Sequence, residues 1–164
     1  MKYYTIYQSI IGEIYIVVEE NAIVGVHIGR EDFLQSEDMD LAAQSNNHPL
    51  LDEAVKQLDE YFSRKRKDFD LPLKENGTQF QTEVWKQLKG IPYGKTLSYQ
   101  DVAIAIGNEK AVRAIGQANK ANKLPIIIPC HRVIGKNKSL TGYAGKRISI
   151  KEQLLILEGA NFKS

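Results

Sequence analysis

The chain has 164 residues, of which 43% are hydrophobic and 26% charged, and its net charge is +2. This composition is typical of a globular protein of one large or two small domains. No apolar run approaches the roughly 20 residues that span a bilayer, and the first residues lack the apolar stretch of a secretory signal. The single cysteine excludes an internal disulfide and a multi-cysteine zinc site, and the three histidines show no metal-ligand spacing. We therefore expect a cytoplasmic protein without a structural metal.

The charge is distributed unevenly along the chain. Residues 1–77 contain 8 Lys and Arg against 15 Asp and Glu, a net −7, whereas residues 78–164 contain 14 against 5, a net +9. A half this basic indicates an anionic partner, most often nucleic acid, although two faces of one domain could also balance each other. The sign changes at residues 73–77, which have the composition of a linker. The sequence therefore predicts two domains, residues 1–76 and 77–164.

The first domain begins with residues typical of β-strands. Apolar and polar residues alternate, and they predict three strands at residues 3–7, 14–18 and 23–28. Residues 30–48 are polar and acidic and predict a loop. An apolar stripe then predicts a helix over residues 50–62, with Pro49 in its first turn. The predicted fold of this domain is α/β, with a small, mainly antiparallel sheet and a helix.

The second domain is predicted to be mainly helical. Thr78 and Gln81 have the spacing of a capping box, at the start of a helix that ends at Gly90. Ser98 begins a short helix, and Asn108 begins another after a tight turn. Two short helices joined in this way are the helix-turn-helix pattern of DNA-binding proteins. Four polar residues would share one face of the second helix: Lys110, Arg113, Gln117 and Lys120.

Three further elements complete the second domain. Residues 124–129, rich in isoleucine and bounded by prolines, predict a short buried extended segment that leads to Cys130. Residues 133–145 contain three glycines and predict a hairpin or glycine-rich loop, which in this setting would be the wing of a winged helix. A closing helix that contains Lys151 is predicted to end at Gly159.

The only cysteine is followed directly by a histidine and an arginine, His131 and Arg132. A lone cysteine is usually a small buried residue, but a neighbouring base or cation favours the thiolate, which is the form that attacks electrophiles. In an extended segment, neighbouring side chains point to opposite faces. His131 would then reach the sulfur of Cys130 only through a bridging water or after a turn.

Glu158 lies in the last turn of the closing helix, where the helix dipole disfavours a carboxylate. It is therefore either solvated or paired with a cation or proton donor. An imidazole such as that of His131 would be a suitable partner, because a carboxylate orients a histidine and raises its basicity.

Residues 129–133, together with the three isoleucines before them, resemble the active-site signature of the O6-alkylguanine-DNA alkyltransferase family. The resemblance covers residues 78–160 and extends weakly into the first domain. Other segments are similar to family segments in the same order and at about the same spacing, namely residues 92–99, 111–116, 141–145 and 157–159. Three features depart from the common pattern and leave the substrate range open: Lys123 follows Asn122 where many members have proline, Lys146 replaces a glycine, and one extra residue separates Tyr143 from Glu158.

The resemblance implies a C-terminal winged helix-turn-helix domain and a DNA-repair activity. The cysteine thiolate of the family takes the alkyl group from O6 of guanine, or less readily from O4 of thymine, and acts once because a thioether is a very poor leaving group. By position, the resemblance implies that Cys130 is the acceptor, that His131 is a general base acting through water, that Glu158 polarises His131, and that Asn122 orients this network. No cofactor is implied.

The same resemblance assigns residues to the base and to DNA. Tyr143 would pack on the target base, the Val133 main chain would read its exocyclic amine, and Tyr99 would help turn the nucleotide out and donate a proton to guanine N3. Because O6 lies inside the duplex, the base must be extruded. Arg113, on a helix in the minor groove, would fill the vacated place in the stack.

Double-stranded DNA carrying O6-alkylguanine is therefore the expected partner, and we expect the protein to be a monomer. Lys110, Gln117, Lys120 and Arg132 would add contacts to DNA that do not depend on its sequence, although Arg132 could equally be a structural strut. Two alternatives remain at this point. One is a winged-helix protein that binds alkyl lesions without repairing them, and the other is a thiol hydrolase that uses the cysteine and histidine.

Overall fold

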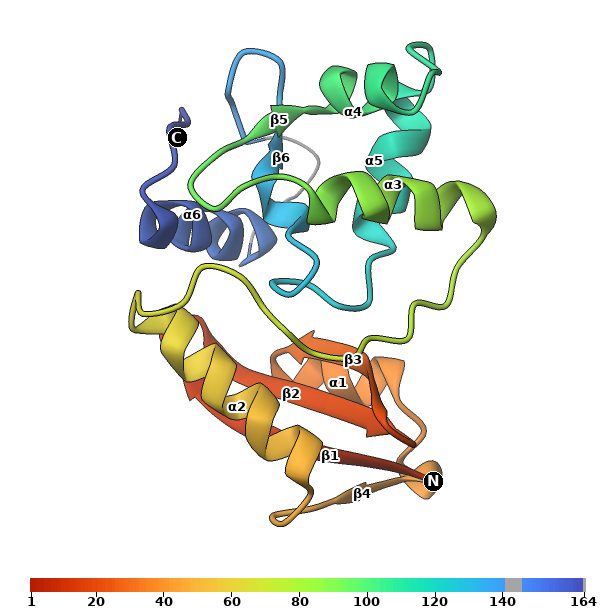
Figure 1. The fold of residues 1–164 in the computed structure, drawn as a ribbon, viewed down its shortest axis with the longest axis vertical. Coiled ribbons are helices and arrows are strands. Elements are labelled where there is room, and N and C mark those ends of the chain that lie inside the picture. Colours follow the sequence, from red (N-terminus) through yellow and green to blue (C-terminus); the bar gives the residue numbers. More distant parts are fainter. Residues whose placement is uncertain (141–145, 164) are drawn as a thin grey trace. The chain divides into compact units, whose positions relative to one another are not determined.

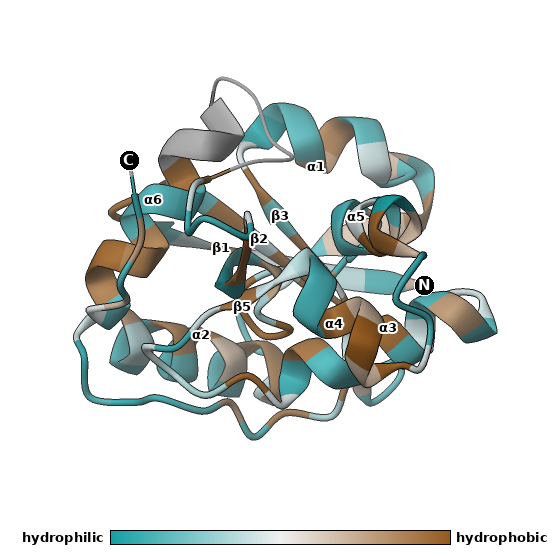
Figure 2. Ribbon diagram, turned by 90° about the horizontal axis from the view of Figure 1, so that it is seen from above, coloured by the Kyte–Doolittle hydropathy of each residue, from teal (hydrophilic) through white to brown (hydrophobic). Residues whose placement is uncertain are grey.

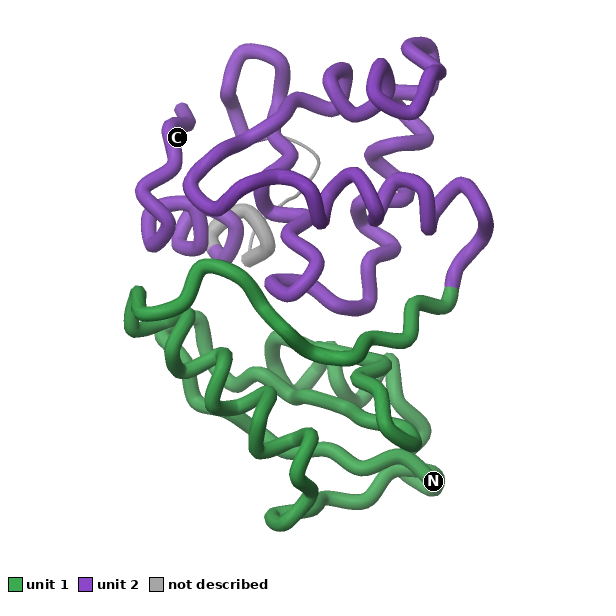
Figure 3. Tube along the Cα trace, viewed as in Figure 1, with its two compact units in different colours: residues 1–76 green, residues 77–164 purple. Residues whose placement is uncertain are grey.

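The computed structural model describes residues 1–140 and 146–163. The chain forms two compact units, Met1–Asn76 and Gly77–Ser164 (Figure 3). The fold class expected from the sequence is confirmed, since a small, mainly antiparallel sheet with helices is followed by a mainly helical unit (Figure 1). No helix within the described ranges is long and apolar enough to cross a membrane.

The first unit is built on a four-stranded sheet. The strands β1 (Lys2–Ser9), β2 (Gly12–Glu19), β3 (Ala22–Ile28) and β4 (Ala42–Gln44) lie in the order β3-β2-β1-β4. The pairs β1–β2 and β2–β3 are antiparallel, and β4 runs parallel to β1. The alternating pattern of the sequence predicted the first three strands, because alternate side chains of a strand face opposite sides.

Helices cover both faces of this sheet. The helix α2 (Pro49–Phe62) packs on β1 and β2, whereas α1 (Arg30–Ser36) packs on β2 and β3. The central residues of β2, from Ile14 to Val18, are all buried, which requires cover on both sides. Tyr15 stacks on Phe33 of α1 with 4.4 Å between ring centroids.

The expectation of a loop over residues 30–48 was wrong. This stretch contains α1, the 3₁₀ turn η1 (Met39–Leu41) and β4. Phe33 is the only buried residue of α1, so the helix has too little apolar periodicity to be recognised among its acidic neighbours.

The second unit contains three helices that pack on one another (Figure 1). These are α3 (Gln79–Lys89), α4 (Tyr99–Ala105) and α5 (Val112–Lys120). Both α3 and α4 begin with a complete capping box, Thr78 with Gln81 and Ser98 with Asp101. Helices of this unit carry hydrophobic and hydrophilic residues on different sides (Figure 2).

Two predicted boundaries in this unit need correction. The helix α5 begins at Val112 rather than Asn108, because Gly107 adopts a φ of 78° and Ala111 N–H donates to the Asn108 carbonyl at 3.0 Å, which closes a turn. Lys110 therefore precedes the helix instead of sharing its face. Residues 124–129 are buried as expected, apart from the half-buried Pro125, but they are not extended. Ile126 has a φ of 75°, and Ile128 N–H donates to the Leu124 carbonyl at 2.8 Å, so the segment is a tight loop.

The remaining elements of the unit surround the residues that follow this loop. The strands β5 (Leu97–Ser98) and β6 (Val133–Ile134) form a short parallel pair, and η2 (Cys130–Arg132) lies between the loop and β6. The closing helix α6 (Lys146–Glu158) contacts η2 and ends before Gly159, whose φ is 70°. Of the predicted wing, residues 135–139 form a turn, and residues 141–145 lie outside the described ranges.

Candidate active site

The position of Cys130 is fixed by the loop that precedes it. Asn122 connects the two ends of this loop, because its Oδ1 accepts from Leu124 N–H at 2.9 Å and its Nδ2 donates to the Ile128 carbonyl at 2.8 Å. Ile126 holds a left-handed conformation that is costly for a β-branched residue, and it is almost completely buried. Asn122 thus orients the backbone before the cysteine through hydrogen bonds to the main chain.

The cysteine itself begins the 3₁₀ turn η2. Cys130 is partly exposed, whereas His131 and Arg132 are buried, with 3% and 5% exposure. The sequence analysis left two ways for His131 to reach the sulfur of Cys130, a bridging water or a turn in the backbone. The backbone does turn at this point. The turn directs the two basic side chains into the unit and leaves Cys130 partly exposed.

The carboxylate of Glu158 accepts hydrogen bonds from both basic side chains. His131 Nε2 lies 2.7 Å from Glu158 Oε2, and Arg132 Nε and Nη2 donate to the two carboxylate oxygens at 2.8 and 3.0 Å. The amide of Gly94 donates to Oε1 at 3.2 Å. Glu158 is therefore not solvated, and the unfavourable helix-end position is offset by these four contacts.

The electrostatics of this network define the protonation of His131. Burial alone would raise the pKa of Glu158, but hydrogen bonds from His131 and Arg132 outweigh it and hold that pKa far below the usual range. Burial lowers the pKa of His131, and the attraction of Glu158 does not offset this effect. A neutral imidazole beside a carboxylate must donate through Nε2, which leaves the lone pair on Nδ1. Nδ1 has no hydrogen-bond partner within the described part of the chain, so it is available as a base.

Lys151 is a residue of the site that the sequence analysis did not identify. It is 2% exposed, its Nζ donates to the Val133 carbonyl at 2.5 Å, and it lies 5.7 Å from the ring centroid of Tyr99. Burial lowers the pKa of Lys151 to about 8, while a charged Cys130 would raise it. Interactions between charges are mutual, so the ammonium favours the thiolate of Cys130. The available signal was a lysine on the apolar face of the closing helix, three and four residues before Leu154 and Leu155.

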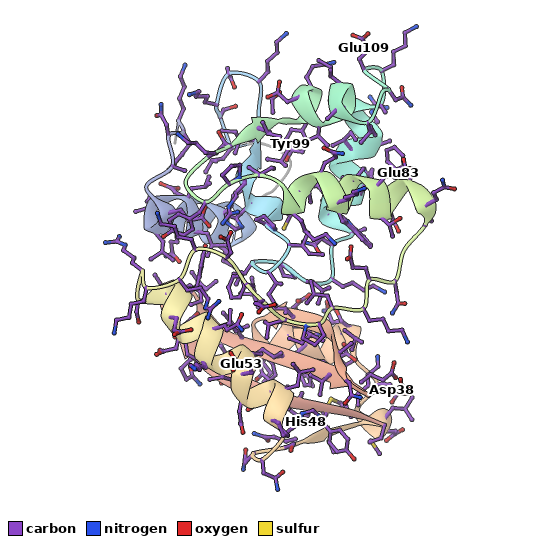
Figure 4. All side chains as sticks on the ribbon, viewed as in Figure 1. Asp38, His48, Glu53, Glu83, Tyr99 and Glu109 are labelled. Atoms are coloured by element: carbon purple, nitrogen blue, oxygen red, sulfur yellow. The ribbon has the colours of Figure 1, made fainter. Side chains whose placement is uncertain are left out.

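Tyr99 is the first residue of α4 and is partly buried (Figure 4). Burial and the charge of Cys130 raise the pKa of Tyr99 to about 12, so its hydroxyl keeps its proton at neutral pH. The structure therefore brings together Cys130, His131, Glu158 and Tyr99, all of which the resemblance assigned to chemistry.

Comparison with known proteins agrees with this arrangement. The model of the 6-O-methylguanine DNA methyltransferase DNA binding domain matches residues 79–160, and that of the ribonuclease-like domain of the same family matches residues 2–74. The chain belongs to the 6-O-methylguanine DNA methyltransferase family. It is 48% identical over 163 residues to the constitutive methylated-DNA–protein-cysteine methyltransferase of Bacillus subtilis, covering 99% of both chains.

Solved structures of this family are similar to nearly the whole chain. The O6-methylguanine methyltransferase of Mycobacterium tuberculosis has a TM-score of 0.87 and 38% identity, and the match covers 97% of this chain and 93% of that chain. A structure of M. tuberculosis OGT in complex with DNA has a TM-score of 0.85 and 38% identity, with 96% and 92% of the two chains covered.

The residues assigned to DNA are distributed differently from the expectation. Arg113, Gln117 and Lys120 are exposed on α5, and Lys110 is exposed in the turn before the helix. For Arg132 the sequence left two roles open, a contact with DNA and a structural strut, and the structure favours the strut. Its guanidinium is buried, binds Glu158, donates to the Ile91 carbonyl at 2.7 Å and lies 5.7 Å from the ring centroid of Tyr93.

Two other assignments concern the target base. The Val133 carbonyl lies at the site and accepts from Lys151, whereas Tyr143 lies outside the described residues. No group of three or more His, Cys, Asp or Glu side chains in the described ranges is arranged to hold a metal ion.

Proposed function

We propose that this member of the methyltransferase family repairs DNA by transferring the alkyl group from O6-alkylguanine, and less readily from O4-alkylthymine, irreversibly to Cys130. The observation that carries the proposal is the connected series of a partly exposed cysteine, a buried neutral histidine with an available Nδ1, and an ionised glutamate 2.7 Å from Nε2. DNA is the partner named for a close structural relative.

Binding begins at the basic face of α5, which we place in the minor groove. Gln117 and Lys120 on this face, and Lys110 in the turn before the helix, supply contacts that do not depend on sequence. The target base leaves the stack because O6 cannot otherwise reach a cysteine held within the protein. Arg113 then fills the vacated place, where its planar guanidinium stacks while its charge faces phosphates.

The transfer has a simple proton balance. The thiol proton of Cys130 passes through a water to Nδ1 of His131, and Glu158 stabilises the imidazolium that forms. The thiolate attacks the alkyl carbon, the bond from that carbon to O6 breaks, and Tyr99 gives a proton to N3, so that guanine leaves neutral. Exchange with solvent then restores Tyr99 and His131.

The product state explains why the reaction occurs once. The alkyl group is held in a thioether, which is a very poor leaving group, and the acceptor is consumed. The ammonium of Lys151 is a second positive charge, beside the imidazolium of His131, that stabilises the attacking thiolate. Asn122 keeps the loop before Cys130 in place.

The test is stoichiometry with a radiolabelled O6-methylguanine oligonucleotide and the monomeric protein. Label is expected to reach protein up to one equivalent and then stop. Cys130→Ala is expected to accept no label but to retain binding to the lesion, because α5 and the residues around position 130 remain. Continued release of product beyond one equivalent would indicate a thiol hydrolase instead, and binding without any transfer by the natural protein would indicate a lesion-binding module.

A further inference from the structure

Asn119 connects the acceptor cysteine to Tyr99. It lies in the last turn of α5 and is 1% exposed. Its Nδ2 donates to the Cys130 carbonyl at 3.3 Å, and its side chain also hydrogen-bonds the Tyr99 hydroxyl. The backbone at this point is fixed from the other side, because Trp85 Nε1 donates to the Ala118 carbonyl at 2.9 Å.

The direction of the hydrogen bond to Tyr99 follows from the amide atom that makes it. Asn119 Oδ1 is engaged in no hydrogen bond within the described residues, so Nδ2 makes the contact with Tyr99. In agreement with a donated hydrogen bond, this contact lowers the pKa of Tyr99, opposing the larger effect of burial. A hydrogen bond that favours the ionised form of a hydroxyl must be donated to its oxygen. The amide nitrogen is the only donor of an asparagine side chain and carries two hydrogens. Asn119 Nδ2 therefore donates one hydrogen to the Cys130 carbonyl and the other to the Tyr99 oxygen.

This geometry determines where the Tyr99 proton can point. A hydroxyl that accepts from Asn119 directs its own hydrogen away from that amide. We propose that Asn119 is a positioning residue, which holds the Cys130 carbonyl and turns the Tyr99 O–H toward the flipped base. The inference rests on the proposed function, in which Tyr99 protonates guanine N3.

The proposal gives α5 two roles at its two ends. Arg113 is the second residue of the helix and faces DNA, and Asn119 is the second residue from its end and faces the chemistry. One rigid helix of nine residues would thus set the register between the vacated stack and the proton donor.

The experiment compares Asn119→Leu, Tyr99→Phe and the double variant. The first readout is the rate constant of methyl transfer from an O6-methylguanine duplex, and the second is the rate of Cys130 alkylation by iodoacetamide, which needs no proton from Tyr99. Asn161→Leu, the same change at an exposed position of the same unit, is the control. Asn119→Ala replaces Asn119→Leu if thermal unfolding shows that the leucine is not accommodated.

We expect the loss of Asn119 to slow methyl transfer by about ten- to a hundredfold, which is part of what a positioned general acid contributes. The iodoacetamide rate is expected to stay within about twofold, and the double variant is expected to be no slower than Tyr99→Phe alone, because both changes remove one function. Losses that multiply, or equal slowing of both reactions, would overturn the inference. Failure of the natural protein to transfer methyl would instead contradict the proposed function.

Discussion

Replacing Glu158 with glutamine tests how much of the site depends on one buried carboxylate. The two oxygens accept four hydrogen bonds, from His131, from two nitrogens of Arg132 and from the Gly94 amide. A glutamine keeps one acceptor oxygen and places an NH₂ group against the remaining donors. Arg132 is then a buried cation without its counter-ion.

The expected cost follows from that uncompensated charge. Removing one partner of a buried ion pair costs about 3–5 kcal/mol. For a protein of this size each kcal/mol lowers the melting temperature by about 2–4 °C, so Glu158→Gln is expected to lower it by roughly 6–20 °C. Glu152→Gln, the same change on the same helix at a partly exposed position, is expected to alter stability by at most about 0.5 kcal/mol.

A double variant separates stability from chemistry. Arg132→Met combined with Glu158→Leu removes both charges and is expected to recover at least half of the lost stability, because no unpaired ion remains. Methyl transfer is expected to stay slow in both variants, because Glu158 also raises the pKa of His131 and holds its ring. Thermal and urea unfolding measure the first effect, and transfer assays measure the second. A melting temperature of Glu158→Gln within about 2 °C of the natural protein, or a double variant less stable than the single one, would refute this reasoning.

Three further predictions concern DNA, pH and the backbone. Arg113→Ala is expected to slow repair of duplex DNA more than reaction with free O6-benzylguanine, since only a duplex has a vacated place to fill. Equal slowing of both reactions would contradict the proposal that Arg113 fills that place. Burial lowers the pKa of Lys151 from 10.5 to about 8, so its charge opposes folding at pH 7, and stability rises as the pH passes from 8 toward 10.5. Lys151→Met is therefore expected to raise the melting temperature at pH 7 and to abolish the increase of stability between pH 8 and 10.5. The same variant is expected to slow iodoacetamide alkylation of Cys130 about tenfold, because the thiolate loses a neighbouring cation. Lower stability with unchanged thiol reactivity would contradict this prediction. Gly94 has a φ of +80°, and an added Cβ would lie 3.1 Å from a backbone carbonyl at the end of α6. Gly94→Ala is therefore expected to cost about 1–3 kcal/mol in urea unfolding, whereas Gly116→Ala, in open space within α5, is expected to be neutral or stabilising, and equal effects would contradict the argument.

Local patterns in the sequence predicted the parts of the fold that local physics determines. The alternation in the first 28 residues gave three strands, and the Thr78 and Ser98 caps gave the starts of α3 and α4. The sequence also suggested a network of Cys130, His131 and Glu158. A reactive thiolate requires a nearby base or cation, and a carboxylate at a helix C-terminus is stabilised by a cation or proton donor. The structure resolves the choice left open for Glu158 by placing it against His131.

What the sequence did not reveal depends on contacts between distant residues. The left-handed conformation of Ile126 opposes its own preference and is maintained by the surrounding packing, so no propensity predicts the tight loop. Arg132 has the appearance of a surface cation in a basic domain until Glu158 and the Ile91 carbonyl are brought beside it. Lys151 acquires its role only when α6 is placed against the cysteine turn and the Val133 carbonyl.

Peptide mass spectrometry after incubation with an O6-methylguanine duplex tests the central claim most directly. We predict that the peptide containing Cys130 gains the mass of one methyl group, that no other peptide does, and that the oligonucleotide recovers unmodified guanine. An unaltered Cys130 peptide after prolonged incubation of folded, lesion-bound protein would contradict the account.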